Sequence, residues 1–202
     1  MLKKLVILLS LVSGAWSMTE KATGISFAPK NRDGELFGVG VRKKGPISVY
    51  AVGMYCTGAL KEKLAILSRT AEKGKHALQV LREGAKTEPC TTFLLQMSFK
   101  VGAEKISAAI ADSVASRYSG TDEINSLKSL IFNGVSAKGA ATKGTTFLFD
   151  CSPEGIEVAV DGNVQGQVPS PGLAKAFCDV YLDDKCVSPA LISSCLENCC
   201  AP

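Results

Sequence analysis

The chain has 202 residues, of which 46% are hydrophobic and 21% are charged, and it contains no low-complexity tract. This composition is typical of a globular protein and excludes a disordered one, and the length suits a single domain with a sizeable core. The formal net charge is +4, but basic and acidic residues are mixed along the chain and form no basic stripe. Nucleic acid is therefore not an expected partner.

The first seventeen residues have the layout of a secretory signal peptide. Two lysines precede an apolar run over residues 5–12, and the small residues Ala15 and Ser17 follow it. The run is shorter than the ~20 apolar residues that span a bilayer. We expect residues 1–17 to be cleaved, an uncleaved anchor being the alternative. Residues 18–202 should then form a single exported domain in the secretory pathway, secreted or extracytoplasmic, with no later membrane span.

Eight cysteines follow that segment, and an even number behind a signal peptide predicts disulfide bonds in an oxidising compartment. They are Cys56, Cys90, Cys151, Cys178, Cys186, Cys195, Cys199 and Cys200. Four of them lie in the C-terminal tail, residues 186–202, which we expect to be joined by disulfides locally or to the sheet. Because the C-x3-C-C spacing matches no usual zinc site and the single histidine, His76, is remote, no metal is expected.

Hydrophobic periodicity and turn residues predict hairpins interleaved with helices. In chain order they are strands 36–43 and 47–56, helices 59–68 and 73–82, strand 91–99, helices 102–118 and 121–134, strands 145–151, 156–160 and one from Val164, and helices 171–181 and 189–196. Thr121 is the expected N-cap of its helix and Gly134 the glycine that ends it. The run Asp161-Gly162-Asn163 predicts a tight hairpin turn.

Strands joined by such short turns are antiparallel, so the pattern indicates an α+β fold with one antiparallel sheet and helices on one side. No catalytic motif stands out in the chain. His76 lies in a polar helical stretch and is expected to face solvent, and there is no G-x-S-x-G, H-E-x-x-H or Walker loop. Gly38 and Gly40 lack the spacing of a dinucleotide site, so no cofactor is expected. They indicate a bulge or a close backbone approach instead.

Arg42 and Tyr50 stand out by elimination, as a lone arginine and a lone tyrosine in apolar strands. Gly45-Pro46 predicts a turn between them, which would set the two residues roughly opposite each other on adjacent strands, sharing one face. An arginine is rarely buried unless an anion pairs with it. Either Arg42 faces water or it faces a ligand, and the residues alone leave both possibilities open.

Three blocks of sequence together resemble the chalcone isomerase family. They are "GVGVRKKGPISVYAVGMY", "KGTTFLFDCSPEGIEV" and "LAKAFCDVYLDDKCVSPAL", and the resemblance extends from about Phe37 to about Ser194. It implies an open-faced β-sandwich, in which a large antiparallel sheet carries a layer of helices on one face. The family contains isomerases that cyclise chalcones to flavanones and non-catalytic relatives, some of which bind fatty acids.

The resemblance also assigns roles residue by residue. Arg42 matches the isomerase arginine that stabilises developing negative charge, and Lys105 matches the family's lysine. The other polar positions of the isomerases fall at Tyr50, Gly102, Ala109 and Leu191. Cyclisation needs hydrogen-bond donors that hold the reacting groups in attack geometry, and the last three residues have no side-chain donor.

An Arg and Tyr pair is what the fatty-acid-binding relatives use to hold a carboxylate. The resemblance therefore implies a non-catalytic protein that binds a fatty acid or similar anionic apolar molecule in a cleft between sheet and helices. Arg42, Tyr50 and Lys105 would be the ligand-binding residues, and small and apolar residues of 102–114 would line the tail. The alternatives are a chalcone isomerase-type intramolecular lyase acting through Arg42 and Lys105, and a purely structural or interaction protein, since fold alone does not give function.

Overall fold

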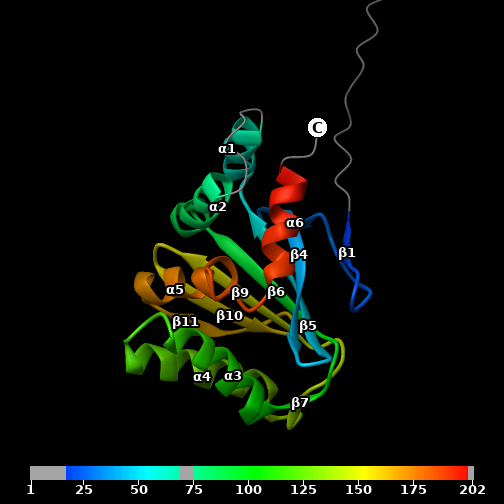
Figure 1. Cartoon of the computed structure of the whole chain (residues 1–202). Coiled ribbons are helices and arrows are strands. Elements are labelled where there is room, and N and C mark those ends of the chain that lie inside the picture. The colour runs from blue at the N-terminus through cyan, green and yellow to red at the C-terminus, as the bar shows by residue number, and fades with distance from the viewer. Residues whose placement is uncertain (1–16, 69–74, 200–202) are drawn as a thin grey trace, which may run out of the picture.

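The computed structural model describes residues 17–68 and 75–199, which form a curled antiparallel sheet with helices packed against it (Figure 1). The large sheet has seven strands in the order β11-β10-β9-β6-β5-β4-β3, and every neighbouring pair is antiparallel. Their bounds are β3 Lys30–Asn31, β4 Gly34–Lys44, β5 Ile47–Cys56, β6 Thr91–Met97, β9 Thr146–Ser152, β10 Gly155–Val160 and β11 Asn163–Val168.

Helices cover one face of this sheet, and two short hairpins complete the described part. The helices are α1 Gly58–Ser68, α2 Lys75–Thr87, α3 Ala103–Ala115, α4 Thr121–Ser136, α5 Pro171–Leu182 and α6 Pro189–Cys199. Helix α6 packs on β4, α5 on β9 and β10, α4 on β10 and β11, and α3 on α4 (Figure 1). The hairpins pair β1 (Met18–Glu20) with β2 (Ile25–Phe27) and β7 (Val101–Gly102) with β8 (Ala140–Ala141). The α+β fold with one large antiparallel sheet is confirmed.

Aromatic side chains attach α5 to the middle of the sheet. Phe177 packs on the sheet over the neighbouring strands β6 and β9, with ring centroids 5.8 Å from Phe93 and 4.5 Å from Phe149. One turn further along the helix, Tyr181 stacks on Phe93 at 4.7 Å. All four rings are buried. Because residues four apart lie on the same helix face, this packing also directs the Tyr181 hydroxyl toward β5.

The opposite face of the sheet carries a smaller apolar cluster. Successive side chains of a strand point to opposite faces, so Ala51 and Tyr55 of β5 face away from the helical layer. They pack with Leu36 and with Phe27 of the β1–β2 hairpin. This hairpin contacts β4 and therefore covers part of the second face. The β1–β2 hairpin and the short strands β3, β7 and β8 were not predicted, because strands of two or three residues show too little hydrophobic periodicity.

The longer elements lie where the sequence predicts them, with shifted ends. Strand β5 has the predicted bounds, whereas β6 ends at Met97 and α2 continues to Thr87. The predicted turn at 161–163 is confirmed, since Asp161 and Gly162 have φ angles of 48° and 79°. The predicted start of α2 at residue 73 lies outside the described residues.

Two predictions about α4 are wrong. The helix begins at Thr121, so the capping residue is Gly120, and it continues through Gly134 to Ser136. Gly134 lies where α4 meets β10, and a Cβ atom there would sit 2.3 Å from Cγ2 of Val160. This glycine therefore serves close packing and does not end the helix. Gly38 and Gly40 do mark the predicted close approach, since Cβ atoms there would lie 2.6 Å from backbone nitrogens of α6.

The structure bears on the signal-peptide and disulfide predictions only through the residues that it describes. Of the proposed signal peptide, only Ser17 is described, so that assignment stays a prediction. Cys90, Cys151, Cys178 and Cys186 are free thiols here, and the predicted disulfide bonds are not shown. His76 is exposed on α2, as expected. No helix in the described part of the chain is long and apolar enough to cross a bilayer.

The role of Gly134 can be tested by replacing it with alanine. Alanine is the better helix former by about 1 kcal/mol, so propensity alone predicts stabilisation. The contact with buried Val160 predicts the reverse, a destabilisation of about 1–3 kcal/mol, because the helix must move away from β10. Urea unfolding followed by circular dichroism measures the difference. Gly58→Ala in α1 is the control, since nothing lies within 4 Å of a Cβ there and its stability should be unchanged or higher. A Gly134→Ala protein as stable as Gly58→Ala would contradict the packing role.

Candidate ligand-binding site

Arg42 and Tyr50 lie directly opposite each other in the β4–β5 hairpin. The pairing predicted from the turn at Gly45-Pro46 is therefore confirmed. Tyr50 is buried in the centre of the sheet, where it also pairs with Met97 of β6. The register shifts between Arg42 and Lys43, an irregularity of the kind that redirects a side chain at the end of a strand.

Two further residues complete a polar cluster around this pair. The Tyr50 hydroxyl forms a hydrogen bond of 3.1 Å with the hydroxyl of Tyr181 from α5. Arg42 donates from Nη1 to Oγ of Ser113 in α3, at 3.0 Å. The Ser113 hydroxyl donates in turn to the backbone oxygen of Ala109, at 2.8 Å. Two strands and two helices thus bring their side chains to one point.

The charge of Arg42 is held by neutral groups. Within the described residues no carboxylate pairs with it, and its guanidinium donates to the Ser113 hydroxyl. Burial acts to lower the pKa of Arg42, but the Tyr50 and Tyr181 oxygens act to raise it, and the pKa lies above its ordinary value. Burial raises the pKa of Tyr181 well above its usual range, so its hydroxyl stays protonated. The cluster is therefore cationic at every physiological pH.

A cavity of about 510 Å³ opens beside the cluster, between the β4–β5 hairpin and α3. It is lined by Arg42, Lys43, Lys44, Ile47, Val49, Tyr50, Phe99, Lys100, Val101, Gly102, Lys105, Ile106, Ala109 and Ile110. The lining contains five cationic side chains and no acidic one, and the rest is mostly apolar. Its size is within the range of small-molecule sites in proteins. Arg42, Tyr50 and Lys105, the three residues singled out from the sequence, all line this one cavity.

Tyr181 and Ser113 were not predicted as site residues. The spacing of Phe177 and Tyr181, four residues apart on one helix, was the available signal for an aromatic face on α5. Of the positions that correspond to polar isomerase residues, Gly102 and Ala109 line the cavity without a side-chain donor. Leu191 is fully buried where α6 meets the backbone of β4, away from the cavity lining.

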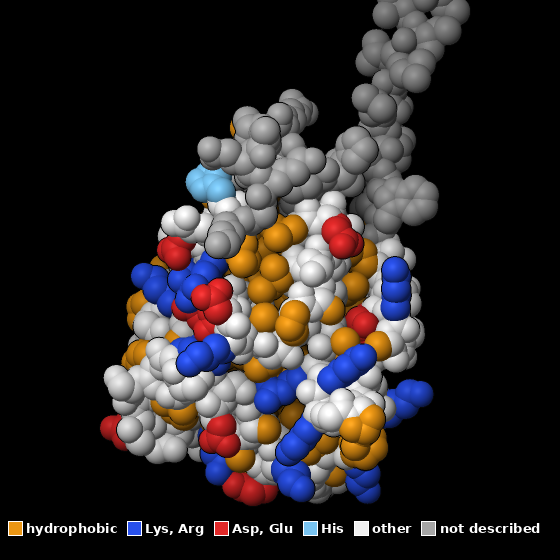
Figure 2. Space-filling view, in the orientation of Figure 1, with side chains coloured by type: hydrophobic (Ala, Val, Ile, Leu, Met, Phe, Trp, Pro, Cys, Tyr) orange, Lys and Arg blue, Asp and Glu red, His pale blue; other side chains and the backbone are white. Residues whose placement is uncertain are grey.

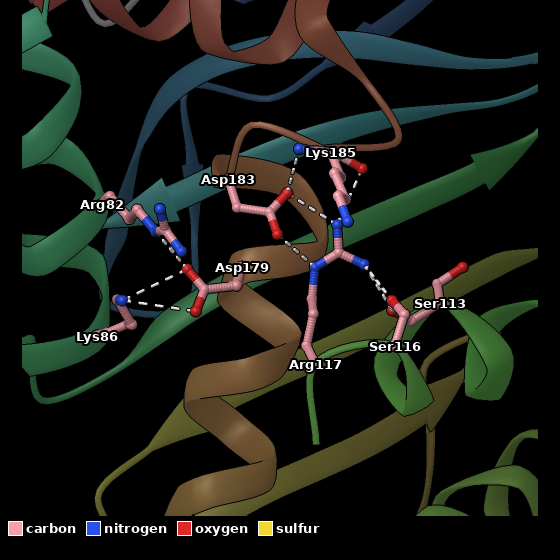
Figure 3. Close-up of polar contacts among 8 residues, drawn as sticks. All are labelled: Arg82, Lys86, Ser113, Ser116, Arg117, Asp179, Asp183 and Lys185. Atoms are coloured by element: carbon pink, nitrogen blue, oxygen red, sulfur yellow. Dashed lines mark hydrogen bonds and ion pairs between the residues drawn. The ribbon is translucent and has the colours of Figure 1, made fainter. Parts of the chain in front are cut away.

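A second set of charges, paired with carboxylates, fixes the helices around the site (Figure 3). Arg117, which follows α3, donates from Nε and Nη2 to both carboxylate oxygens of Asp183 at 2.7 and 2.8 Å. It also donates from Nη1 to the backbone oxygen of Ser113, at 2.7 Å. Asp179 of α5 accepts from Arg82 Nε at 2.7 Å and pairs with Lys86, both from α2. The Arg117 contacts hold α3, which carries Ser113, against the end of α5, which carries Tyr181, and the Asp179 contacts hold α2 against α5.

Comparison with known proteins agrees with this architecture. The model of the family described as chalcone isomerase-like matches residues 25–196. The chain belongs to the chalcone isomerase-like family. A crystal structure of a fatty-acid binding protein from Arabidopsis thaliana is similar to this family member, with a TM-score of 0.71 and 24% sequence identity. The similarity covers 92% of this chain and 98% of that one, and at this identity it shows a shared fold. No curated protein matches the sequence.

The Arg117–Asp183 pair predicts a pH-dependent contribution to the stability of this chalcone isomerase-like protein. Burial acts to raise the pKa of Asp183, but its hydrogen bonds and attraction to Arg117 outweigh burial, and the pKa is lowered. A carboxyl whose folded-state pKa is depressed stabilises the fold above its unfolded pKa, about 3.9. That contribution is lost as the pH falls through the lower folded-state value.

Asp183→Asn should therefore lower the free energy of unfolding by about 1–3 kcal/mol at neutral pH. The gap from wild type should shrink as the pH falls through the lowered pKa of Asp183, because the wild-type carboxyl then becomes protonated too. Urea unfolding across this range measures it. The control is Asp184→Asn, because Asp184 is the next residue and is exposed, so its stability should follow wild type. A gap that stays constant with pH would show that the loss is one of packing and not of charge.

Proposed function

We propose that this protein binds a fatty acid or a similar anionic, apolar small molecule, with the head group at Arg42 and the tail along α3. The observation that carries the proposal is the environment of Arg42: a half-buried guanidinium at an apolar cavity, held by hydroxyl groups and by no carboxylate of the described chain. An arginine in such surroundings favours an anionic partner.

The chemistry of the cluster suits a carboxylate. A guanidinium can bind both carboxylate oxygens through two parallel hydrogen bonds, which sets the orientation as well as the affinity. Tyr50 adds a neutral donor, and its bond to Tyr181 orients that hydroxyl. Ile106, Ala109 and Ile110 supply an apolar wall for a tail. The Arabidopsis protein of the same fold is described as a fatty-acid binding protein, which adds support.

The affinity for a long-chain fatty acid tests this proposal. Arg42→Ala should weaken binding by about 2–5 kcal/mol, because it removes the charged partner of a desolvated carboxylate. Tyr50→Phe removes one neutral donor and should weaken binding by about 0.5–1.5 kcal/mol. Lys105→Ala is the comparison at the cavity edge and should have a smaller effect than Arg42→Ala. Calorimetric or fluorescent titration gives the dissociation constants, and circular dichroism confirms folding.

Arg82→Ala is the matched control for loss of an arginine. Its partner Asp179 keeps Lys86, and the change lies outside the cavity, so affinity should equal that of wild type. If Arg42→Ala folds and binds like the Arg82 variant, or if wild type binds no fatty acid, the head-group assignment is wrong.

An isomerase of the chalcone isomerase type, acting through Arg42 and Lys105, is the second candidate because both cations line the cavity. Gly102 and Ala109 line it without side-chain donors, however, and Leu191 supplies none. Removing one such donor typically lowers the rate ~10²-fold or more. Chalcone cyclisation should therefore proceed near the spontaneous rate. A spectrophotometric assay in which wild type clearly exceeds that rate, and Arg42→Ala does not, would favour the isomerase instead.

A further inference from the structure

The rim of the cavity carries a cluster of unpaired positive charges. Lys43 and Lys44 end β4, Lys100 follows β6, and Lys105 lies in the first turns of α3. All four side chains are exposed and line the cavity with Arg42. Every ion pair found in the described residues involves other cations, so none of these lysines is matched by a carboxylate.

These five charges make the charge distribution of the protein asymmetric. From residue 18 onward the chain has 21 Lys and Arg against 19 Asp and Glu. The described residues contain 19 of these cations and 18 of these acids, and five of the cations line one cavity, so the other 14 are outnumbered by the 18 acidic residues. Such an asymmetric distribution orients a protein toward a negatively charged partner before contact. The oriented end is the one that contains the cavity mouth.

Exposed apolar side chains lie among these lysines. The described residues include four exposed large hydrophobic side chains, Ile47, Ile66, Phe99 and Val164. Two of them, Ile47 at 41% and Phe99 at 48% exposure, line the same cavity as the lysines. At the lower right of Figure 2, where Figure 1 places β7 and the β4–β5 turn, Lys and Arg side chains surround hydrophobic ones.

Backbone contacts hold these two apolar residues at one end of the sheet. The backbone nitrogens of Ser98 and Phe99 both donate to the oxygen of Val49, at 3.0 and 3.2 Å. The Ser98 hydroxyl donates to the oxygen of Ser48, at 2.6 Å. These bonds hold the backbone of Phe99 against β5, two residues along the strand from Ile47.

We propose that this rim, defined by Lys43, Lys44, Ile47, Phe99, Lys100 and Lys105, docks the cavity mouth onto the surface of an anionic phospholipid bilayer. The lysines contact the lipid head groups, and Ile47 and Phe99 enter the boundary between head groups and acyl chains. Lysines are attracted to an anionic membrane surface. Exposed apolar side chains can also insert into a bilayer, which a soluble polyanion does not allow. The role of this docking rests on the proposed function. A fatty acid partitions into bilayers, so docking would let it pass directly between the bilayer and the cavity.

Vesicle co-sedimentation of the protein without added fatty acid tests the docking surface. The probes are vesicles of phosphatidylcholine alone and of an equal mixture of phosphatidylcholine and phosphatidylglycerol. We expect binding to the mixed vesicles only, weakened by high salt, because salt screens exposed charges. Each lysine near an anionic surface contributes about fivefold to binding, so Lys43→Gln with Lys44→Gln should weaken it roughly 20- to 30-fold. Phe99→Asp should weaken it about tenfold or more through lost apolar insertion.

Matched variants elsewhere on the surface serve as controls. Lys63→Gln with Lys175→Gln removes the same charge from exposed positions outside the rim, and Ile66→Asp changes an exposed apolar side chain on α1. The double lysine variant and the Ile66→Asp variant should each bind mixed vesicles like wild type, once the change in net charge is taken into account. Equal losses in rim and control lysine variants, or equal binding to both kinds of vesicle, would overturn the proposal. So would a Phe99→Asp protein that binds like wild type, because a soluble acidic partner needs no apolar insertion.

The test separates this inference from the proposed function. Vesicle binding is measured without fatty acid, and fatty-acid affinity is measured without vesicles. A protein that binds fatty acid in solution but ignores anionic vesicles retains its proposed function and loses the docking surface. One that binds the vesicles through the rim and binds no fatty acid retains the docking surface and loses the proposed function.

Discussion

The site depends on one charge that the fold keeps half-buried without neutralising it. Arg42 could have been paired internally, had the position of Ser113 on α3 carried an acid. A hydroxyl there accepts a hydrogen bond and holds the guanidinium in place, but it leaves the positive charge available. Tyr50 and Tyr181 act in the same way, since burial keeps the Tyr181 phenol protonated. The result is a rigid cation beside a mostly apolar cavity. The electrostatic field of Arg42 therefore acts on any ligand that enters the cavity.

The structure separates charges that hold the fold together from charges around the cavity. Arg117 and Arg82 bind Asp183 and Asp179 with hydrogen bonds of 2.7 Å, and these pairs tie α3 and α2 to α5. Within the described residues the five cations of the cavity lack such partners. Paired charges cancel each other's field and act only locally, whereas unpaired ones of a single sign add. The helices held by the paired charges therefore keep the five cations of the cavity at one end of the molecule, apart from internal carboxylate partners.

The sequence could predict contacts that local rules determine and could not predict those made between distant segments. Arg42 and Tyr50 face each other because a short turn sets the register of their hairpin, and turn residues are visible in sequence. Tyr181 is 131 residues from its partner Tyr50, and Ser113 is 71 from Arg42, so no local pattern links them. Gly134 shows the same limit. A glycine that ends a helix and one that admits a neighbouring strand look alike until Val160 is seen against it.

The residues without a side-chain donor, Gly102 and Ala109, are also the ones that suit the proposed apolar tail. Gly102 and Ala109 add no polar side chain to the cavity beside Arg42, at two positions that correspond to polar residues of the isomerases. A polar group facing an alkyl chain would lose its water without gaining a partner, which is unfavourable. The lack of a donor at these two positions avoids that loss, but it also removes two groups that could help to stabilise a developing oxyanion. Turnover of a polar substrate and tight binding of an alkyl tail therefore make opposite demands on these positions, and Gly102 and Ala109 suit the proposed binding of a tail.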